Sequence, residues 1–366
     1  MRSLLVAPDK FRSSASAPEV ASAIARAAIS KGWTSVQAPI SDGGEGFLDV
    51  LAQALNASRR SSYVTGPMGN QVEAAWAVAS GNAGTTEQVS GIWRYLGDPA
   101  KAGKIAIIEM ARASGLELAG GPSKNSPMDA TSRGTGELIS LAVSSGAGTV
   151  VIGCGGSATT DGGAPAIEAL RPYTRLKGVR LVVACDVECK FSEAAERFSR
   201  QKGASEAQVR LLTRRLEALA KRYLDEFGVH VEQMSGAGAA GGLAGGLAAV
   251  GAHLVPGFDL ISDLIGLESM VESADLVITG EGCLDEESFN GKALGSMANL
   301  ASKYGKPVLA VVGDNACQNE KPPAARSVQP DGLAIISLTE MYGPERSKGD
   351  VLGCVEEAVA DFLDTF

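Results

Sequence analysis

The sequence predicts an α/β protein in which a doubly wound parallel-sheet domain is interrupted by an inserted second α/β domain. Three observations lead to this fold class. Short apolar runs without polar alternation, as expected of parallel strands covered on both faces, occur near both ends of the chain. Helical patterns follow these runs, and a region of different character separates the two groups. The chain has 366 residues, which is enough for two domains.

The outer parts of the chain alternate between strand and helix patterns. SLLVA predicts a strand over residues 3–7, and a helix is expected from Ala17 to about Ser30. SVQAPI predicts a strand over residues 35–40, with a helix following in GFLDVLAQAL. A helix in EEAVADFLDTF closes the chain. Three further strands are expected before it, at residues 275–279, 307–313 and 333–338.

The middle of the chain follows another pattern. SSYVTGPMGNQVEAAWAVA predicts an antiparallel hairpin that turns at Pro67–Asn70. Strands are expected in IAIIEM, TVVIG and RLVVACDV, and helices in GTGELISLAVSSG and around residues 205–228. We therefore expect one domain at residues 1–60 and 256–366, and the inserted domain at residues 61–255.

Composition and charge narrow the range of partners. The net charge is −9 and no long run of Lys or Arg occurs, which argues against nucleic acids and anionic membranes. No segment approaches a membrane span, and the first apolar stretch is too short for a signal peptide. The six cysteines lack disulfide or zinc spacing. We expect a cytoplasmic protein that acts on small molecules, with its oligomeric state left open.

The segment TGEGCLDEESFNGKA crowds glycines, carboxylates and a lysine at the end of a predicted strand. Gly280 and Gly282 allow the backbone to approach a ligand closely. Glu281 and Asp285 are suited to hold Mg²⁺, and Lys292 is suited to meet a phosphate. A solvated strand-to-helix loop is the alternative interpretation.

Two loops near the N-terminus have a similar character. In APDKFRSSAS, Asp9 and Arg12 are candidate binding residues, although a capped helix start explains the same segment. In SDGGEGF, Asp42 precedes Gly43 and Gly44, two glycines that permit unusual backbone angles. A tight turn before a helix is the alternative there.

Two segments of the middle region are suited to anions. In TSRGTGELI, Arg133 precedes a Gly-Thr-Gly helix start, where backbone N–H groups and a guanidinium bind anions well. A capping box that uses Glu137 is the alternative. The second segment, VVIGCGGSATTDGG, is a glycine loop with hydroxyl and carboxylate side chains. Its candidate phosphate-binding residues are Gly155, Gly156, Ser157, Thr159 and Asp161.

The same glycine loop supports a competing hypothesis. Gly153, Gly155 and Ala158 fit the glycine pattern of dinucleotide-binding proteins, and Asp186 ends the next strand. An NAD(P)-dependent oxidoreductase of a small hydroxy acid is therefore an alternative. The polar side chains of the loop and the long spacing to Asp186 count against it. A P-loop is excluded because its Gly-x-x-x-x-Gly-Lys-Ser/Thr motif is absent.

Ten segments, taken in order, resemble those of bacterial type II glycerate kinases. They are APDKFRSSASAPEVASAI, PISDGGEGFLDVL, VTGPMGNQVEAAWAV, AIIEMARASGLEL, ATSRGTGELI, VIGCGGSATTDGG, LVVACDV, QKGAS, GAGAAGGLAGGL and DLVITGEGCLDEESFNGKA. The resemblance implies a flavodoxin-like doubly wound domain with an inserted second α/β domain and a cleft between them. It also implies ATP- and Mg²⁺-dependent phosphorylation of glycerate, commonly to 2-phosphoglycerate.

Phosphoryl transfer needs aligned reactants, a metal, cations and a group that orients the attacking hydroxyl. We therefore assign hypothetical roles to these residues. Asp186 accepts the substrate hydroxyl proton or orients that hydroxyl. Glu281 and Asp285 hold Mg²⁺. Lys292 and Arg133 neutralise phosphate, or one of them binds the glycerate carboxylate.

The chain also departs from the family pattern. The linker between DGGAPAIEAL and RLVVACDV is shorter than is usual, and no Asn-Pro follows ACDV. Cys283 stands where the family often has Arg, and Lys10-Phe11-Arg12 replaces Ser-Phe-Lys. Because of these departures, a non-catalytic small-acid sensor on the same fold is a further alternative.

Overall fold

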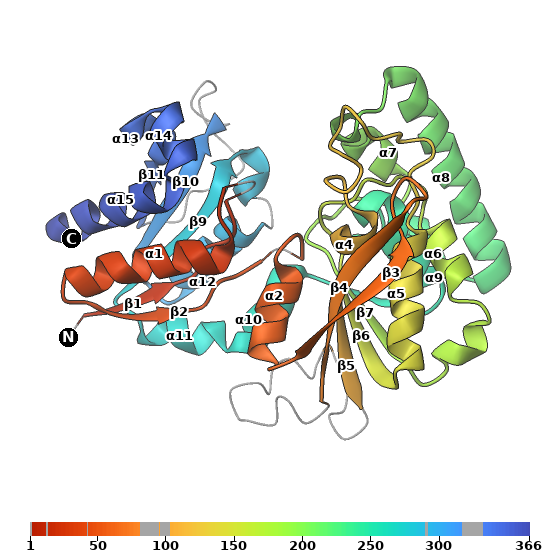
Figure 1. Ribbon diagram of the computed structural model, residues 1–366, viewed down its shortest axis with the longest axis horizontal. Coiled ribbons are helices and arrows are strands. Elements are labelled where there is room, and N and C mark those ends of the chain that lie inside the picture. The colour runs from red at the N-terminus through yellow and green to blue at the C-terminus, as the bar shows by residue number, and fades with distance from the viewer. Residues whose placement is uncertain are drawn as a thin grey trace. The chain divides into compact units, whose positions relative to one another are not determined.

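Two β-sheets, each with its own helices, organise the chain (Figure 1). The structure is a computed structural model. It describes residues 2–11, 14–41, 43–80, 95, 103–289, 292–316 and 332–366. The chain divides into unit 1, Met1–Ser41 with Ile261–Phe366, and unit 2, Asp42–Leu260.

Unit 1 contains a parallel five-stranded sheet in the order β2-β1-β9-β10-β11. Numbered along this unit, the order is 2-1-3-4-5, which is the order of flavodoxin-like sheets and confirms the predicted fold class. All five strands were predicted from the sequence. They are β1 (Ser3–Val6), β2 (Thr34–Gln37), β9 (Leu276–Leu284), β10 (Val308–Asn315) and β11 (Leu333–Ser337).

Helices cover both faces of this sheet. On one face, Ile278 and Val311 pack in a cluster with Ile24 of α1 (Ala17–Ser30) and Val359 of α15 (Val351–Thr365). On the other face, Val312 packs with side chains that include one from α12 (Ala293–Lys303). Burial on both faces explains why the strand sequences are continuously apolar. The remaining helices of this part of the chain are α11 (Leu267–Ser273), η6 (Glu286–Phe289), α13 (Leu338–Tyr342) and α14 (Pro344–Gly349).

Unit 2 contains a mixed six-stranded sheet in the order β3-β4-β5-β6-β7-β8. The first three strands pair antiparallel and the last four pair parallel. The predicted hairpin joins β3 and β4, and its turn closes with a hydrogen bond from Gly66 N–H to the Asn70 carbonyl (2.6 Å). The strands are β3 (Ser58–Thr65), β4 (Gln71–Ala79), β5 (Lys104–Glu109), β6 (Ala147–Gly153), β7 (Arg180–Ala184) and β8 (His253–Val255). Of these strands, β8 was not predicted from the sequence.

The long helix α8 (Glu206–Phe227) packs against the core of unit 2 through one face. Its buried residues recur at the three- and four-residue spacing of an amphipathic helix and include Leu216 and Tyr223. Ser205 caps its first turn by accepting the Gln208 N–H. The other helices are α2 (Phe47–Ala54), α4 (Ala111–Ser114), α5 (Arg133–Ser144), α6 (Ala164–Ala169), η2 (Tyr173–Leu176), α7 (Glu193–Phe198), η3 (Arg200–Lys202), η4 (Val231–Gln233), η5 (Ala239–Gly242), α9 (Leu243–Ala249) and α10 (Gly257–Ile265).

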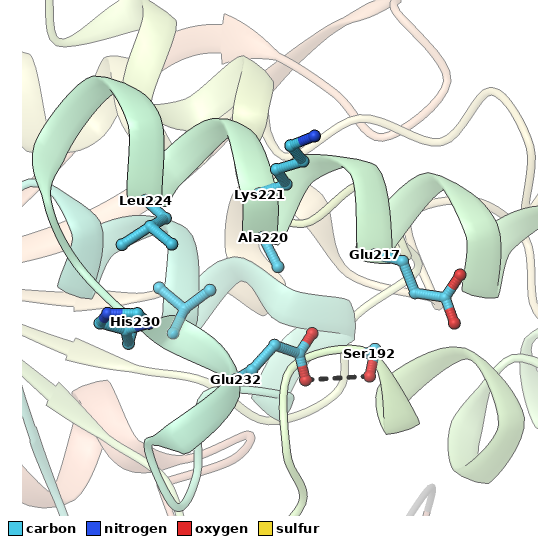
Figure 2. A pocket seen from close by; sticks show the side chains of 8 residues that line it. Ser192, Glu217, Ala220, Lys221, Leu224, His230 and Glu232 are labelled. Carbon is cyan, nitrogen blue, oxygen red and sulfur yellow. Dashed lines mark hydrogen bonds between the residues drawn. The ribbon is translucent and has the colours of Figure 1, made fainter.

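A hollow of about 310 Å³ opens between α8 and η4 (Figure 2). Glu232 lies on its wall and accepts a hydrogen bond from Ser192 Oγ (3.0 Å). The residues that line it are Ser192, Glu217, Ala220, Lys221, Leu224, His230, Val231 and Glu232. None of them is a site residue predicted from the sequence.

The two units differ in extent from the predicted domains. Residues 42–60 group with unit 2, whereas the sequence analysis assigned them to the first domain. The reason is that β3 pairs with β4, while α2 packs against β4 and β5. The second boundary falls inside α10, between Leu260 and Ile261. Among the described residues, no helix combines the length and apolar character needed to cross a bilayer.

Candidate functional site

The carboxyl ends of β5, β6 and β7 lie along one edge of the unit 2 sheet, because these strands are parallel neighbours. The segment that begins with Gly43 and Gly44 joins this edge. Gly155 N–H donates to the Gly43 carbonyl (3.1 Å). A Cβ atom on Gly155 would lie 2.2 Å from Gly44 Cα, so only glycine permits this approach. The structure therefore brings two predicted glycine loops together, while Arg12 and Asp42 lie outside the described residues.

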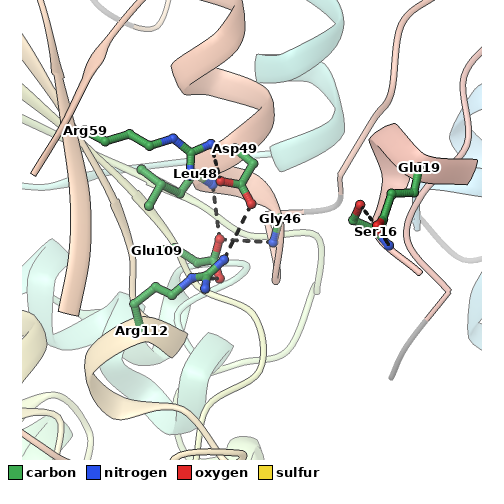
Figure 3. Close-up of polar contacts among 8 residues, drawn as sticks. All are labelled: Ser16, Glu19, Gly46, Leu48, Asp49, Arg59, Glu109 and Arg112. Atoms are coloured by element: carbon green, nitrogen blue, oxygen red, sulfur yellow. Dashed lines mark hydrogen bonds and ion pairs between the residues drawn. The ribbon is translucent and has the colours of Figure 1, made fainter. Parts of the chain in front are cut away.

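Glu109, the last residue of β5, fixes the first of these loops (Figure 3). Its fully buried carboxylate accepts hydrogen bonds from Gly46 N–H (3.0 Å) and Leu48 N–H (3.1 Å) at the start of α2. Its other oxygen accepts from Arg112 Nε (3.1 Å), and Arg112 also reaches Asp49 (3.5 Å). A buried carboxylate needs such partners. Glu109 was not predicted as a site residue, although a charge that ends an apolar strand is a detectable signal in the sequence.

Lys202 of η3 holds the second glycine loop, and the sequence analysis missed it as well. Its ammonium group donates to Ser157 Oγ and to the Thr159 carbonyl, both at 2.7 Å. The residue is only 4% exposed. Burial lowers the pKa of Lys202 to about 8, an effect that the nearby charge of Asp161 opposes.

Asp161 anchors the same loop from within. Its carboxylate accepts hydrogen bonds from Ser132 N–H (2.7 Å) and Gly163 N–H (3.0 Å), and it is 4% exposed. Burial raises the pKa of Asp161, while the hydrogen bonds from Ser132 and Gly163 act in the opposite direction. These bonds connect the glycine loop with the start of α5 and with α6. The contacts of Asp161 are therefore with backbone groups of its own unit.

The glycine-rich segment around η5 supports the loop from a third side. Gly162 N–H donates to the Gly241 carbonyl (3.0 Å), and Tyr223 O–H donates to the Gly162 carbonyl (2.9 Å). A Cβ atom on Gly241 would lie 2.0 Å from the Thr159 carbonyl oxygen, and its φ of +66° favours glycine. The loop that follows β6 is thus held by groups distant in the sequence.

Arg133 lies at the start of α5 with a half-exposed side chain. Its guanidinium contacts Glu137 (3.1 Å) and, more distantly, Glu168 (4.0 Å). Glu137 in turn accepts hydrogen bonds from Thr65 N–H (2.8 Å) and Thr65 Oγ1 (3.0 Å). Glu137 therefore ties α5 to β3, which differs from the capping box considered in the sequence analysis.

Asp186 follows β7 and caps α10. One of its carboxylate oxygens accepts the Gly257 N–H (2.7 Å), and the other accepts the Phe258 N–H (3.1 Å). A carboxylate at a helix N-terminus satisfies amide groups that have no partner within the helix. The Phe258 N–H also lies 3.3 Å from the first of these oxygens.

In unit 1, Asp285 and Lys292 form an ion pair. Lys292 Nζ lies 3.0 Å from one carboxylate oxygen of Asp285 and 3.1 Å from the other. Asp285 also accepts the N–H of Ser288 (3.0 Å), which lies within η6. The side chains are 44% exposed for Asp285 and 21% exposed for Lys292. Both groups are therefore accessible to solvent at a turn that precedes α12.

The predicted glycine motif of unit 1 lies within a strand, which corrects the expected position after the strand. β9 continues to Leu284, and Gly280 pairs with Val311 of β10. Glu281, which is half-buried, and Gly282 belong to the same strand. Asp9 N–H donates to the Gly280 carbonyl (2.8 Å), so the segment after β1 continues alongside β9. The main-chain pairing with β10 extends the strand beyond its apolar run.

Mg²⁺ ligands are sparse in the described part of the chain. No group of three or more His, Cys, Asp or Glu side chains lies together there in a way that could hold a metal ion. Glu281 and Asp285 nevertheless offer the hard oxygen donors that Mg²⁺ prefers. In phosphoryl-transfer enzymes, one or two carboxylates commonly suffice because the phosphates and water complete the coordination.

These features define a class of protein: an α/β protein whose polar glycine loops lie at a sheet edge and suit a small anionic ligand. Comparison with known proteins makes the class specific. The model of the glycerate kinase family matches residues 4–172 and 171–336. The chain belongs to the glycerate kinase family, as its sequence motifs indicated.

Individual relatives agree with this assignment. The chain is 38% identical to glycerate 2-kinase of Escherichia coli K12 over 344 residues, which is 85% of this chain and 84% of the relative. It is 33% identical to glycerate kinase of Bacillus subtilis 168 over 401 aligned positions, covering 98% and 99% of the two chains. A crystal structure of a protein assigned as glycerate kinase 2 from Salmonella typhimurium LT2 aligns with a TM-score of 0.74. It is 30% identical and covers 100% of this chain and 98% of its own.

Proposed function

We propose that this protein transfers the γ-phosphoryl group of ATP to the 2-hydroxyl group of glycerate, giving 2-phosphoglycerate and ADP. The observation that supports this proposal is the family match, which extends through the sequence of both units. The relative named glycerate 2-kinase suggests which hydroxyl is the acceptor. In the reaction, a bond forms between the hydroxyl oxygen and the γ-phosphorus, and the bond from that phosphorus to the ADP oxygen breaks.

The glycine loop after β6 is the proposed phosphate-binding element. Gly155 and Gly156 let the backbone approach an anion, and Ser157 adds a hydroxyl group. The hydroxyl of Thr159 is buried and donates to the Ala240 carbonyl (3.4 Å), so Thr159 supports the loop from within. Lys202 and Asp161 hold this loop by hydrogen bonds, so its donors are positioned before the ligand binds. Such preorganisation lowers the reorganisation that the transition state would otherwise require.

Asp186 is the proposed partner of the glycerate hydroxyl. It is held in place by the amide groups of Gly257 and Phe258, which fix the direction of its carboxylate. Asp186 would orient the attacking oxygen and receive its proton as the new phosphorus–oxygen bond forms.

Cations are the remaining requirement, since negative charge accumulates on the phosphoryl oxygens. Lys292 and Arg133 are the proposed neutralising side chains, each now paired with a carboxylate. Glu281 and Asp285 are the proposed holders of Mg²⁺, which when bound would supply positive charge to neutralise the phosphates. Lys292 keeps Asp285 oriented through its ion pair and is suited to contact a phosphate oxygen at the same turn.

The test is phosphorus NMR of the product formed from ATP and D-glycerate by the purified protein. We expect ADP together with the phosphomonoester signal of 2-phosphoglycerate, and no product from 3-hydroxypropionate, which has the same carboxylate and the 3-hydroxyl but lacks the proposed acceptor, the 2-hydroxyl. Formation of 3-phosphoglycerate instead would contradict the proposed acceptor hydroxyl. Hydrolysis of ATP or its persistence without any phosphoglycerate would contradict the proposed activity.

A further inference from the structure

The buried ammonium group of Lys202 determines how Ser157 can form hydrogen bonds. A protonated lysine only donates, so Ser157 Oγ must act as the acceptor in their 2.7 Å contact. The hydroxyl proton of Ser157 is then not shared with Lys202 and can be donated to another group. Within the described part of the chain, Ser157 Oγ makes no second hydrogen bond. A donor is thus left available on the proposed phosphate-binding loop.

We propose that Lys202 is a positioning residue which holds Ser157 so that the serine hydroxyl donates to a phosphate oxygen of the nucleotide. This inference rests on the proposed function, because it assigns the ligand of the loop from the proposed reaction. Lys202 does not contact the ligand itself. Its second bond, to the Thr159 carbonyl, fixes the loop on the far side of Ala158 and limits movement of Ser157.

The surroundings of Lys202 allow its protonation to be tested. Asp161, from the loop after β6, and Cys189, from the segment after β7, are the titratable groups that act on it. Burial raises the pKa of Cys189 to about 11, so this thiol is neutral near pH 8. The coulombic effect of Asp161 favours the protonated lysine. Burial nevertheless lowers the pKa of Lys202 to about 8.

Deprotonation of Lys202 would reverse the hydrogen bond. A neutral amine has a lone pair and can accept the proton of Ser157, which removes the donor from the ligand. We therefore expect the turnover of the wild-type protein to decline as the pH rises above about 8. The Ser157→Ala variant lacks the hydroxyl whose hydrogen bond would change direction. Its remaining activity should therefore not decline above pH 8.

The experiment compares Lys202→Met, Ser157→Ala and the double variant in the ATP- and glycerate-dependent reaction, with Lys221→Met as the control. Lys221 is an exposed lysine of α8. We expect each single variant to lose about a hundredfold in kcat/KM, as for one preorganised donor, and the control to match wild type. Because both changes remove the same hydrogen-bond donor, the double variant should be no slower than the slower single variant.

Several outcomes would overturn this role for Lys202. A Lys202→Met protein with wild-type kcat/KM would do so, as would losses that multiply in the double variant or a Ser157→Ala protein with full activity. If Lys202→Met fails to fold, the pH profiles decide: a decline above pH 8 that Ser157→Ala retains would refute the proposal. A wild-type protein that forms no phosphoglycerate would refute the proposed function and this inference together, whereas an active wild type with an unaffected Lys202→Met refutes only the inference.

Discussion

Each unit has one aspartate and one lysine associated with its glycine-rich segment. The environments of these two aspartate–lysine sets are opposite. In unit 2, Asp161 and Lys202 are each 4% exposed and bind backbone and hydroxyl groups of the loop after β6 and of the start of α5. In unit 1, Asp285 and Lys292 bind each other directly at 3.0 Å, with side chains 44% and 21% exposed. The first set is enclosed by its own unit, and the second is open to solvent.

This difference in exposure suggests different roles: the buried set positions the loop, and the exposed set contacts the substrate. Burying a charge is costly unless hydrogen bonds compensate, so Asp161 and Lys202 must keep their partners for the loop to stay intact. An exposed ion pair contributes little to stability and can exchange one partner for another. We therefore expect changes in the buried set to alter stability, with Lys202→Met lowering kcat/KM as well through Ser157. Changes in the exposed set should lower kcat/KM with little effect on stability.

The largest expected effect is on catalysis, from Lys292→Ala. Loss of a cation placed against the phosphoryl oxygens should cost about 3 kcal/mol of transition-state stabilisation, which is about a hundredfold in kcat/KM. Its ion pair is partly exposed, so the free energy of unfolding should change by less than about 1 kcal/mol. Steady-state kinetics and urea unfolding of the same preparation measure the two quantities.

Lys303→Ala is the matched control, because Lys303 lies on the same helix α12 and is paired with Glu268 on the surface. It should keep wild-type kinetics. Two results would contradict the distinction between the buried and the exposed set. One is an unchanged kcat/KM in Lys292→Ala, and the other is a loss of unfolding free energy as large as its loss of transition-state stabilisation.

The next largest expected effect is a difference in stability between variants of Asp161 and Asp285. Asp161→Ala leaves the N–H groups of Ser132 and Gly163 buried without an acceptor, which should cost about 2 kcal/mol or more. Asp285→Ala removes a bond at an exposed turn and should cost less than about 1 kcal/mol. Urea unfolding measures both, and equal losses would mean that burial does not separate these residues.

Comparing sequence with structure shows which features local patterns encode. The five strands of unit 1 and the hairpin of unit 2 were predicted because apolar runs and turn residues are local signals. The glycine loops were also recognised. The partners of the charged side chains were not, since they depend on tertiary packing. Lys202, in the polar stretch QKGAS, is indistinguishable in sequence from an exposed lysine, yet η3 places it in the interior.

Asp186 illustrates the same limit from the other direction. Its position after an apolar strand correctly suggested a residue at the sheet edge, but the amide groups that hold it belong to Gly257 and Phe258, about seventy residues later. The strand β8 was missed because three residues are too few for a periodic signal. The extension of β9 through Gly280 and Gly282 was missed because glycine is a weak strand former, and here pairing with β10 outweighs that preference.

A smaller effect should appear in the pH dependence of stability. The pKa of Lys202 is about 8 in the folded protein and about 10.4 in an unfolded chain, so the unfolded state binds more protons between these values. Stability should therefore rise with pH in this window, by about 1 kcal/mol from pH 8 to pH 9. The measurement is the unfolding free energy of wild type minus that of Lys202→Met. If this difference in unfolding free energy falls or stays constant between pH 8 and pH 9, the pKa of Lys202 is not lowered by burial in the folded protein.

The smallest expected stability change is that of Arg133→Ala, an exposed contrast within unit 2. Its pair with Glu137 is of the i,i+4 type and should contribute about 0.5 kcal/mol or less to stability. Glu137→Ala should cost more, because Glu137 also accepts two hydrogen bonds from Thr65. If Arg133 neutralises phosphate, its removal should lower kcat/KM at least tenfold despite the small change in unfolding free energy. Wild-type kinetics in Arg133→Ala would leave Lys292 as the proposed cation and assign Arg133 to the surface of α5.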